Sequence, residues 1–230
     1  MLTLSPLETE ALRLSLLVSL VAVAGSLPPG IAIAWLLARR RFPGKTLLDG
    51  LVHLPLVLPP VAVGYLLLVT MGRTGPIGSW LYATFGVTFA FNWKGAALAS
   101  AVISFPLLVR ALRLSIEAVD RGVEAAASSL GAGPWAVFFT VTLPLSLPGL
   151  IAGMILAFAR SLSEFGATIT FVASIPGQTR TLPVALYGAT QSASGDEAAL
   201  RLCIISVALA LITLVIADFL SRRLEKRMKG

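Results

Sequence analysis

Charged residues are scarce in this sequence. Only 13% of its 230 residues are Asp, Glu, Lys or Arg, and 57% are hydrophobic, whereas an average soluble domain is about 25% charged. A soluble fold of this length cannot hide so much apolar surface, so lipid must solvate much of the chain. The net charge of +7 is then a matter of membrane topology, and we expect no nucleic-acid partner.

Residues that carry common catalytic and metal chemistry are almost absent. The single cysteine, Cys203, rules out a disulfide within the chain, and the single histidine, His53, leaves little for a metal site. No Gly-x-Ser triplet occurs, which weighs against an intramembrane serine hydrolase. Gly44-Lys45-Thr46 matches the end of a phosphate-binding loop, but position 39 is arginine where that pattern needs glycine. We therefore expect no catalytic residue, metal site or cofactor in this chain.

Long apolar windows are what the chain has instead. A membrane-spanning helix needs about 20 apolar residues, and the first window is too long for a signal peptide, so it predicts a retained span. The chain is expected to be a single all-α membrane domain over residues 1–230 with about five transmembrane helices, at residues 14–38, 50–72, 96–114, 141–162 and 198–220.

The basic residues predict the orientation. Twelve of the 18 lysines and arginines follow the first, third and fifth windows, and such an excess favours the cytoplasmic side. The N-terminus is therefore expected outside and the C-terminus in the cytoplasm, where the basic tail would contact lipid headgroups.

Two segments fit this scheme less simply. Residues 74–93 are uncharged but rich in glycine and aromatic residues, which predicts an interfacial loop. Residues 165–195 predict an extension of the fourth span, a turn, and a short or re-entrant helix. Irregular backbone at that depth must be shielded by protein or line a water-filled path.

The fourth span carries the clearest polar signal. Arg160 and Glu164 are four residues apart, so they share a helix face and can pair. Burying such residues in a membrane is costly, which favours a role in a translocation path, although a stabilising ion pair at the outer interface explains them equally well. The candidate path or gate residues are Arg160, Ser163, Glu164, Phe165, Gly166 and Thr168. Gly149 and Gly153 have the spacing of a close helix contact.

Residues 120–144 predict a helix, a tight turn and a second helix. Asp120 can cap a helix that runs to Leu130, and Gly131 can stop it. Pro134 suits the first turn of the next helix. On physical grounds alone, this hairpin is either an amphipathic interfacial element or a surface that another protein approaches closely.

This hairpin resembles the signature loop of binding-protein-dependent ABC-transporter permeases. The likeness is carried by Glu124-Ala125-Ala126, by Gly131 seven residues after the glutamate, and by the Phe138-Phe139 and Leu143-Pro144 ending. In that family the loop forms coupling helices that dock on a separate ATP-binding subunit. The resemblance implies a coupling loop at about residues 117–144, with Glu124, Ala125, Ala126, Leu130, Gly131 and Ala132 as coupling residues.

The same resemblance implies the rest of the assembly. The fold would be that of a type I ABC importer permease in a bacterial inner membrane, pairing with a second copy of itself. Two ATPase subunits would carry ATP-Mg, and a periplasmic oxyanion-binding protein would deliver the solute. The stretches FPGKTLLDGLVHLPLVLPPVAVGYLLL and FARSLSEFGATITFVASIPGQTRTLP resemble the molybdate/tungstate group of these permeases. A sulfate/thiosulfate permease is the alternative, and a secondary transporter is the rival class.

Overall fold

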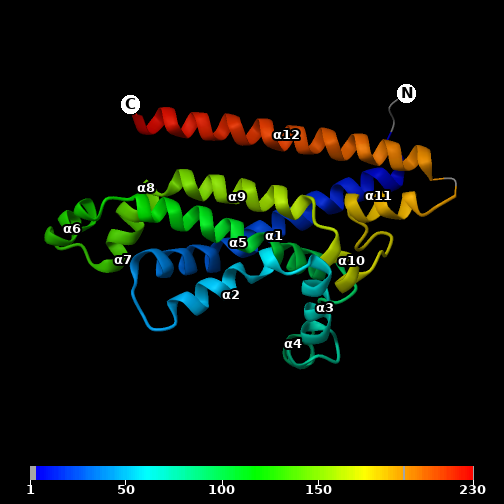
Figure 1. The fold of residues 1–230 in the computed structure, drawn as a ribbon, viewed down its shortest axis with the longest axis horizontal. Coiled ribbons are helices and arrows are strands. Elements are labelled where there is room, and N and C mark those ends of the chain that lie inside the picture. Colours follow the sequence, from blue (N-terminus) through cyan, green and yellow to red (C-terminus); the bar gives the residue numbers. More distant parts are fainter. Residues whose placement is uncertain (1–3, 194, 230) are drawn as a thin grey trace.

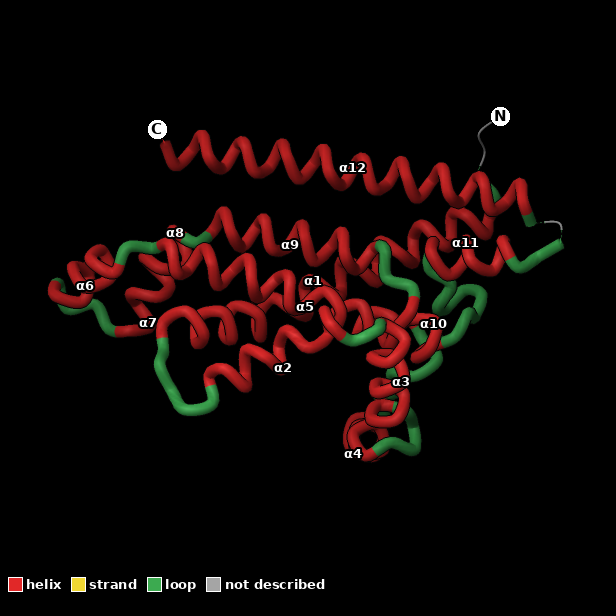
Figure 2. Tube along the Cα trace, viewed as in Figure 1, coloured by secondary structure: helices red, strands yellow, loops and turns green. Residues whose placement is uncertain are grey.

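The computed structural model describes residues 4–193 and 195–229, and all of their regular elements are helical. Figure 2 shows these helices joined by loops, without a strand in the described part of the chain. The elements are α1 (Pro6–Arg39), α2 (Lys45–Val57), α3 (Pro60–Met71), α4 (Pro76–Phe85), α5 (Trp93–Ala118), α6 (Arg121–Ser129), α7 (Pro134–Val137), the π-turn η1 (Phe138–Thr142), α8 (Leu143–Leu145), α9 (Leu147–Leu162), α10 (Gly166–Val172), α11 (Leu182–Thr190) and α12 (Asp196–Lys229). The predicted all-α class is confirmed.

The described helices provide three to five membrane spans. α1, α5 and the Asp196–Ala217 part of α12 are each long and apolar enough to cross a bilayer. Two further spans are broken. The helix axis bends by 114° between α2 and α3, and by 67° between the Pro134–Leu145 and Leu147–Leu162 segments. The predicted count of about five holds if each bent pair counts as one span.

The second window differs from a straight helix because of its prolines. Pro59 has no backbone N–H, and its ring disfavours a helical conformation at the preceding residue. Leu58 accordingly has extended backbone, with φ −69° and ψ 140°. The three prolines of the window at residues 50–72, Pro55, Pro59 and Pro60, predict a broken or kinked helix, and the break is confirmed between α2 and α3. Beyond it, α3 projects sideways from the bundle with α4 (Figure 1).

Three helices form the centre of the molecule. α5 packs against both α1 and α9, and the buried core between them is made of side chains such as Leu37, Leu108, Leu112 and Ala157. The predicted glycine contact is confirmed here, since a methyl group added at Gly149 would overlap Ser115 of α5. Small residues let the two helix backbones approach closely.

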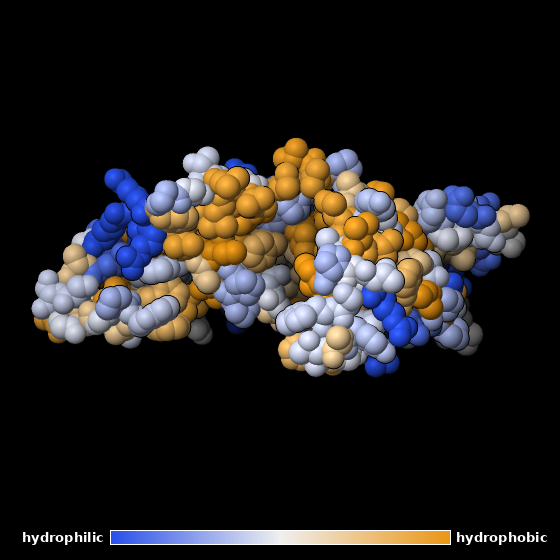
Figure 3. All heavy atoms as spheres, turned by 90° about the horizontal axis from the view of Figure 1, so that it is seen from below, coloured by the Kyte–Doolittle hydropathy of each residue, from blue (hydrophilic) through white to orange (hydrophobic). Residues whose placement is uncertain are grey.

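α12 runs along one side of this bundle, next to α9 and α11 (Figure 1). Only 6% of its most apolar window is buried, so most of that surface faces the surroundings. Near its start, Arg201 Nε lies 2.8 Å from Glu8 Oε1 of α1. Seen from below, hydrophobic surface covers the middle of the long axis and many hydrophilic residues gather toward its ends (Figure 3). That distribution suits a chain whose long axis crosses a bilayer.

The structure departs from the predictions for residues 74–93 and for residues 165–195 in different ways. Residues 74–93 are not simply a loop, because they contain α4, which begins at Pro76 and is stopped by Gly86 at φ +65°. In residues 165–195 the predicted turn and short helix α11 are confirmed, but the predicted extension of the fourth span is a separate helix, α10, which begins after a break at residues 163–165.

Candidate functional site

The α6–α7 hairpin lies at one end of the long axis, which we call the loop end (Figure 1). Asp120 Oδ1 accepts a hydrogen bond from the backbone N–H of Gly122 at 2.7 Å and so caps α6. Gly131 follows the helix with φ +91°, a left-handed conformation that favours glycine. Pro134 stands in the first turn of α7. The predicted helix, turn and helix are confirmed.

The hairpin exposes apolar side chains. No residue of α6 is buried, and Leu130 is 90% exposed, with Val123 at 47%. Trp135 and Phe139 are exposed on the α7 side. Because exposed apolar surface is typical of a contact region on a protein, the outer face of the hairpin is a candidate docking surface.

Glu124 does not belong to that outer face. Its Oε1 lies 3.0 Å from Arg39 Nη2 at the end of α1 and accepts a hydrogen bond from the Thr142 hydroxyl at 2.6 Å. Arg39 Nη2 also donates to the carbonyl of Val119 at 3.0 Å. Within this chain, Glu124 therefore fastens the hairpin to α1 and η1. Of the other predicted coupling residues, Ala125, Ala126, Leu130 and Gly131 are exposed, and Ala132 is half-buried.

Aromatic rings make a second attachment of the hairpin. Trp35 of α1 stacks on Trp135 with ring centroids 6.4 Å apart and meets the edge of Phe138 at 5.9 Å. Phe138 in turn contacts Phe139 at 5.0 Å. Such ring pairs contribute about 0.5–1.5 kcal/mol each beyond the area they bury. A force applied to the hairpin would reach α1 through both attachments.

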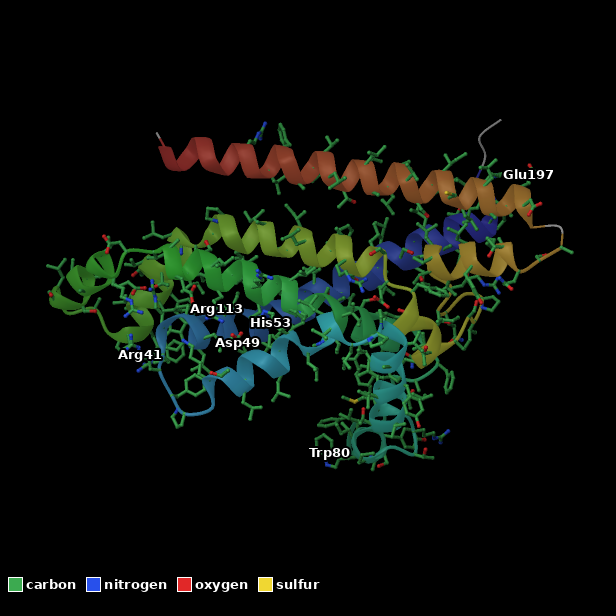
Figure 4. The ribbon with its side chains drawn as sticks, viewed as in Figure 1. Arg41, Asp49, His53, Trp80, Arg113 and Glu197 are labelled. Atoms are coloured by element: carbon green, nitrogen blue, oxygen red, sulfur yellow. The ribbon has the colours of Figure 1, made fainter. Side chains whose placement is uncertain are left out.

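A separate charged contact joins α2 to α5. Arg113 Nη1 lies 2.9 Å from Asp49 Oδ2, and Arg113 Nε lies 2.9 Å from Glu117. His53 Nδ1 is 2.9 Å from the backbone carbonyl of Asp49. Figure 4 shows Asp49, His53 and Arg113 together between the two helices. His53 therefore has a local structural role.

The candidate path residues surround the break between α9 and α10. Arg160 Nη1 lies 2.8 Å from Glu164 Oε2, as predicted, and the Glu164 side chain is only 1% exposed. Glu164 Oε1 also accepts the backbone N–H of Ala167 at 2.8 Å and so caps α10. The Glu164 carboxylate thus neutralises Arg160 and also caps the start of α10.

The six candidates do not share one surface. Ser163 is exposed and Arg160 partly exposed, whereas Glu164 and Thr168 are buried. The Thr168 hydroxyl has no hydrogen-bond partner among the described residues. Gly166 faces Pro60 of α3, and Phe165 contacts Tyr187 of α11 with ring centroids 5.0 Å apart. The break between α9 and α10 is therefore packed between α3 and α11.

The sequence did not predict two ion pairs that join distant helices. Arg39 and Arg201 were counted only as charges that report topology, yet each pairs with a glutamate. No local spacing indicates either pair, because the partners come from distant windows. Among the described residues, no group of three or more His, Cys, Asp or Glu side chains could hold a metal ion.

The helical bundle, with its broken spans and its protruding hairpin, defines a polytopic membrane protein. Residues 30–230 match the family model described as the binding-protein-dependent transport system inner membrane component. The chain belongs to that family.

Curated relatives match nearly the whole chain. It is 63% identical to the molybdenum transport system permease protein ModB of Escherichia coli (strain K12), over 96% of both chains. ModB of Haemophilus influenzae is 55% identical over 96% of this chain and 97% of its own. The sulfate transport system permease protein CysW of Synechococcus elongatus is 36% identical, over 96% of this chain and 76% of its own.

The fold also recurs in solved structures. A bacterial ABC transporter that imports alginate superposes with a TM-score of 0.76 at 19% identity, covering 96% of this chain and 80% of that one. The MetNI methionine ABC transporter superposes with a TM-score of 0.71 at 16% identity, covering 96% and 99%. At these identities the likeness concerns the fold, which is that of type I ABC importer permeases.

Proposed function

We propose that this chain is the membrane subunit of an ATP-driven molybdate importer, which also carries tungstate. The proposal is supported by the ModB relatives, which match both the apolar windows and the hairpin over nearly the full length. The similarity to the sulfate permease CysW is lower and covers less of that protein.

The docking hairpin is the structural feature that best supports the proposed transport mechanism. Its outer face presents Leu130, which is 90% exposed, while its inner face is fastened to α1 by Glu124 and Arg39. A partner that pulls on this hairpin would therefore move α1. We infer that two ATPase subunits carry ATP-Mg and dock here, one on each of two copies of this chain.

The transport step would be alternating access. Closure of the ATPase subunits would bring the two hairpins together and turn the path between the two copies from inward to outward facing. A periplasmic-type oxyanion-binding protein would supply the anion on the opposite side. The loop end is then cytoplasmic in an inner membrane, in agreement with the excess of basic residues on that side.

Cells that lack this gene test the proposal. They would be complemented with the wild-type chain, with Leu130→Asp, or with Leu4→Asp as a control at an exposed leucine far from the hairpin. We expect wild type and Leu4→Asp to restore uptake of molybdate and tungstate at low concentration, and Leu130→Asp to insert without restoring it.

Three results would contradict the proposal. Restoration of sulfate uptake alone would favour the sulfate permease. Normal uptake with Leu130→Asp would remove the docking role of the hairpin. Purification of the functional transporter without any ATPase subunit would favour a secondary carrier.

A further inference from the structure

A cavity of about 760 Å³ lies between α1, α2 and α5. Its walls are formed almost entirely by apolar side chains, including Leu51 of α2 and Ala97, Ala101 and Phe105 of α5. Gly25 of α1 faces open space, since a methyl group added there would meet nothing within 4 Å. Apart from Ser26, Trp93 and Lys94, these walls offer a dianion no side-chain hydrogen-bond donor, so most of the cavity is unsuited to the transported anion.

A second, polar cavity of about 400 Å³ adjoins the first at the start of α5. The two cavities share Trp93 and Lys94, and the second is also lined by Thr88, Asn92 and Gln178. An apolar chamber and a polar chamber thus meet at one lysine. This combination fits an amphipathic molecule with a hydrocarbon tail and a polar head.

Lys94 supplies the charge of the polar chamber. Its side chain is exposed and has no ion-pair partner among the described residues. The first backbone N–H groups of α5 are already satisfied, because Asn92 Oδ1 accepts from Lys94 at 2.9 Å and from Gly95 at 3.2 Å. The ammonium group is therefore the charged donor that this chamber offers to an anion.

The length of the apolar cavity corresponds to one leaflet. Its α5 wall runs from Trp93 to Phe105, which is about 18 Å at 1.5 Å per residue. Half of a hydrocarbon core about 30 Å thick is about 15 Å. Tryptophan and lysine at one end are typical of the membrane interface, and here that end lies away from the loop end (Figure 1).

We propose that the two cavities together hold one anionic phospholipid of the leaflet away from the loop end. An acyl chain lies between α1, α2 and α5, and the phosphate pairs with Lys94. The lipid would fill the space between α2 and α5 that their direct contacts leave open, namely the Asp49–Arg113 ion pair and the packing of Leu48 and Val52 in the core. Bound lipid therefore supports the position of α2.

Native mass spectrometry of the purified chain tests the site with phosphatidylglycerol and phosphatidylcholine as probes. Lys94→Gln removes the charge, and Ala101→Phe fills the groove. Ala210→Phe adds the same volume on the exposed side of α12 and is the matched control. We expect the wild type and Ala210→Phe to prefer phosphatidylglycerol, Lys94→Gln to lose about tenfold of that preference, and Ala101→Phe to bind neither lipid at this site. Unchanged lipid binding by Ala101→Phe, or an unchanged preference in Lys94→Gln, would overturn the proposal.

A photo-reactive amino acid in place of Ala101 identifies the occupant directly. In vesicles of phosphatidylglycerol and phosphatidylethanolamine, an adduct with the mass of phosphatidylglycerol supports the site. Cross-linking to a second copy of the chain would instead assign the groove to a protein interface and overturn the lipid proposal. Neither readout depends on transport, so the result is independent of the proposed cargo.

Discussion

Gly64→Ala perturbs the contact between the broken second span and the candidate path. Gly64 lies in α3, and a methyl group added there would stand 2.5 Å from the carbonyl oxygen of Ala167 and 2.9 Å from Cβ of Thr170 in α10. Neither atom is the end of a flexible side chain. The two helices would have to separate, and overpacking of this kind costs about 1–3 kcal/mol.

The matched control is Gly50→Ala in α2, where the added methyl group meets nothing within 4 Å. Alanine is about 1 kcal/mol better than glycine in a helix interior, so Gly50→Ala should be neutral or stabilising. Gly64→Ala gains the same helix propensity but loses about 1–3 kcal/mol of unfolding free energy through overpacking. The difference in unfolding free energy between the two variants is therefore expected to be about 1–3 kcal/mol.

Reversible unfolding of the purified chain in mixed micelles, followed by circular dichroism, measures this difference. We expect Gly64→Ala to unfold at a lower denaturant concentration than Gly50→Ala and to transport more slowly, because α10 is displaced. Equal stability of the two variants would refute the close α3–α10 packing.

Three further predictions concern the loop, the path and the topology. Gly131→Trp should insert normally but bind the ATPase poorly, because tryptophan is strained at φ +91°; normal ATPase pull-down and uptake would contradict this. Glu164→Gln leaves the charge of Arg160 without its carboxylate and should lose about 1–3 kcal/mol of stability along with transport, which a thermal shift paired with an uptake assay would detect; an unchanged melting temperature would refute the ion pair. In a chain whose Cys203 is replaced by serine, a cysteine near residue 5 should react with an impermeant reagent from outside and one near residue 226 should not; labelling of both from one side would overturn the five-span topology.

Short-range features of the fold could be predicted from the sequence. The hairpin is set by Asp120, Gly131 and Pro134, which act within one or two turns of the backbone they control. The Arg160–Glu164 pair is likewise a matter of helix periodicity. Such signals depend on local geometry alone, and the structure agrees with them.

Long-range features could not be predicted in the same way. Prolines indicated a break in the second window, but the 114° bend depends on how α3 packs against α10. Glu124 was placed with the coupling residues, yet its partner Arg39 comes from the end of the first span. The helix α4 was missed although Pro76 and Gly86 are ordinary helix boundaries, because the aromatic and glycine content of residues 74–93 favoured a loop.

The central claim is that this chain moves molybdate only when an ATPase acts on its hairpin. Proteoliposomes containing the chain and its ATPase, with ATP inside and an oxyanion-binding protein outside, would measure it as uptake of labelled molybdate. We predict accumulation that requires hydrolysable ATP and is lost when the chain carries Leu130→Asp. Uptake by the chain alone, driven by an ion gradient without the ATPase, would contradict the account.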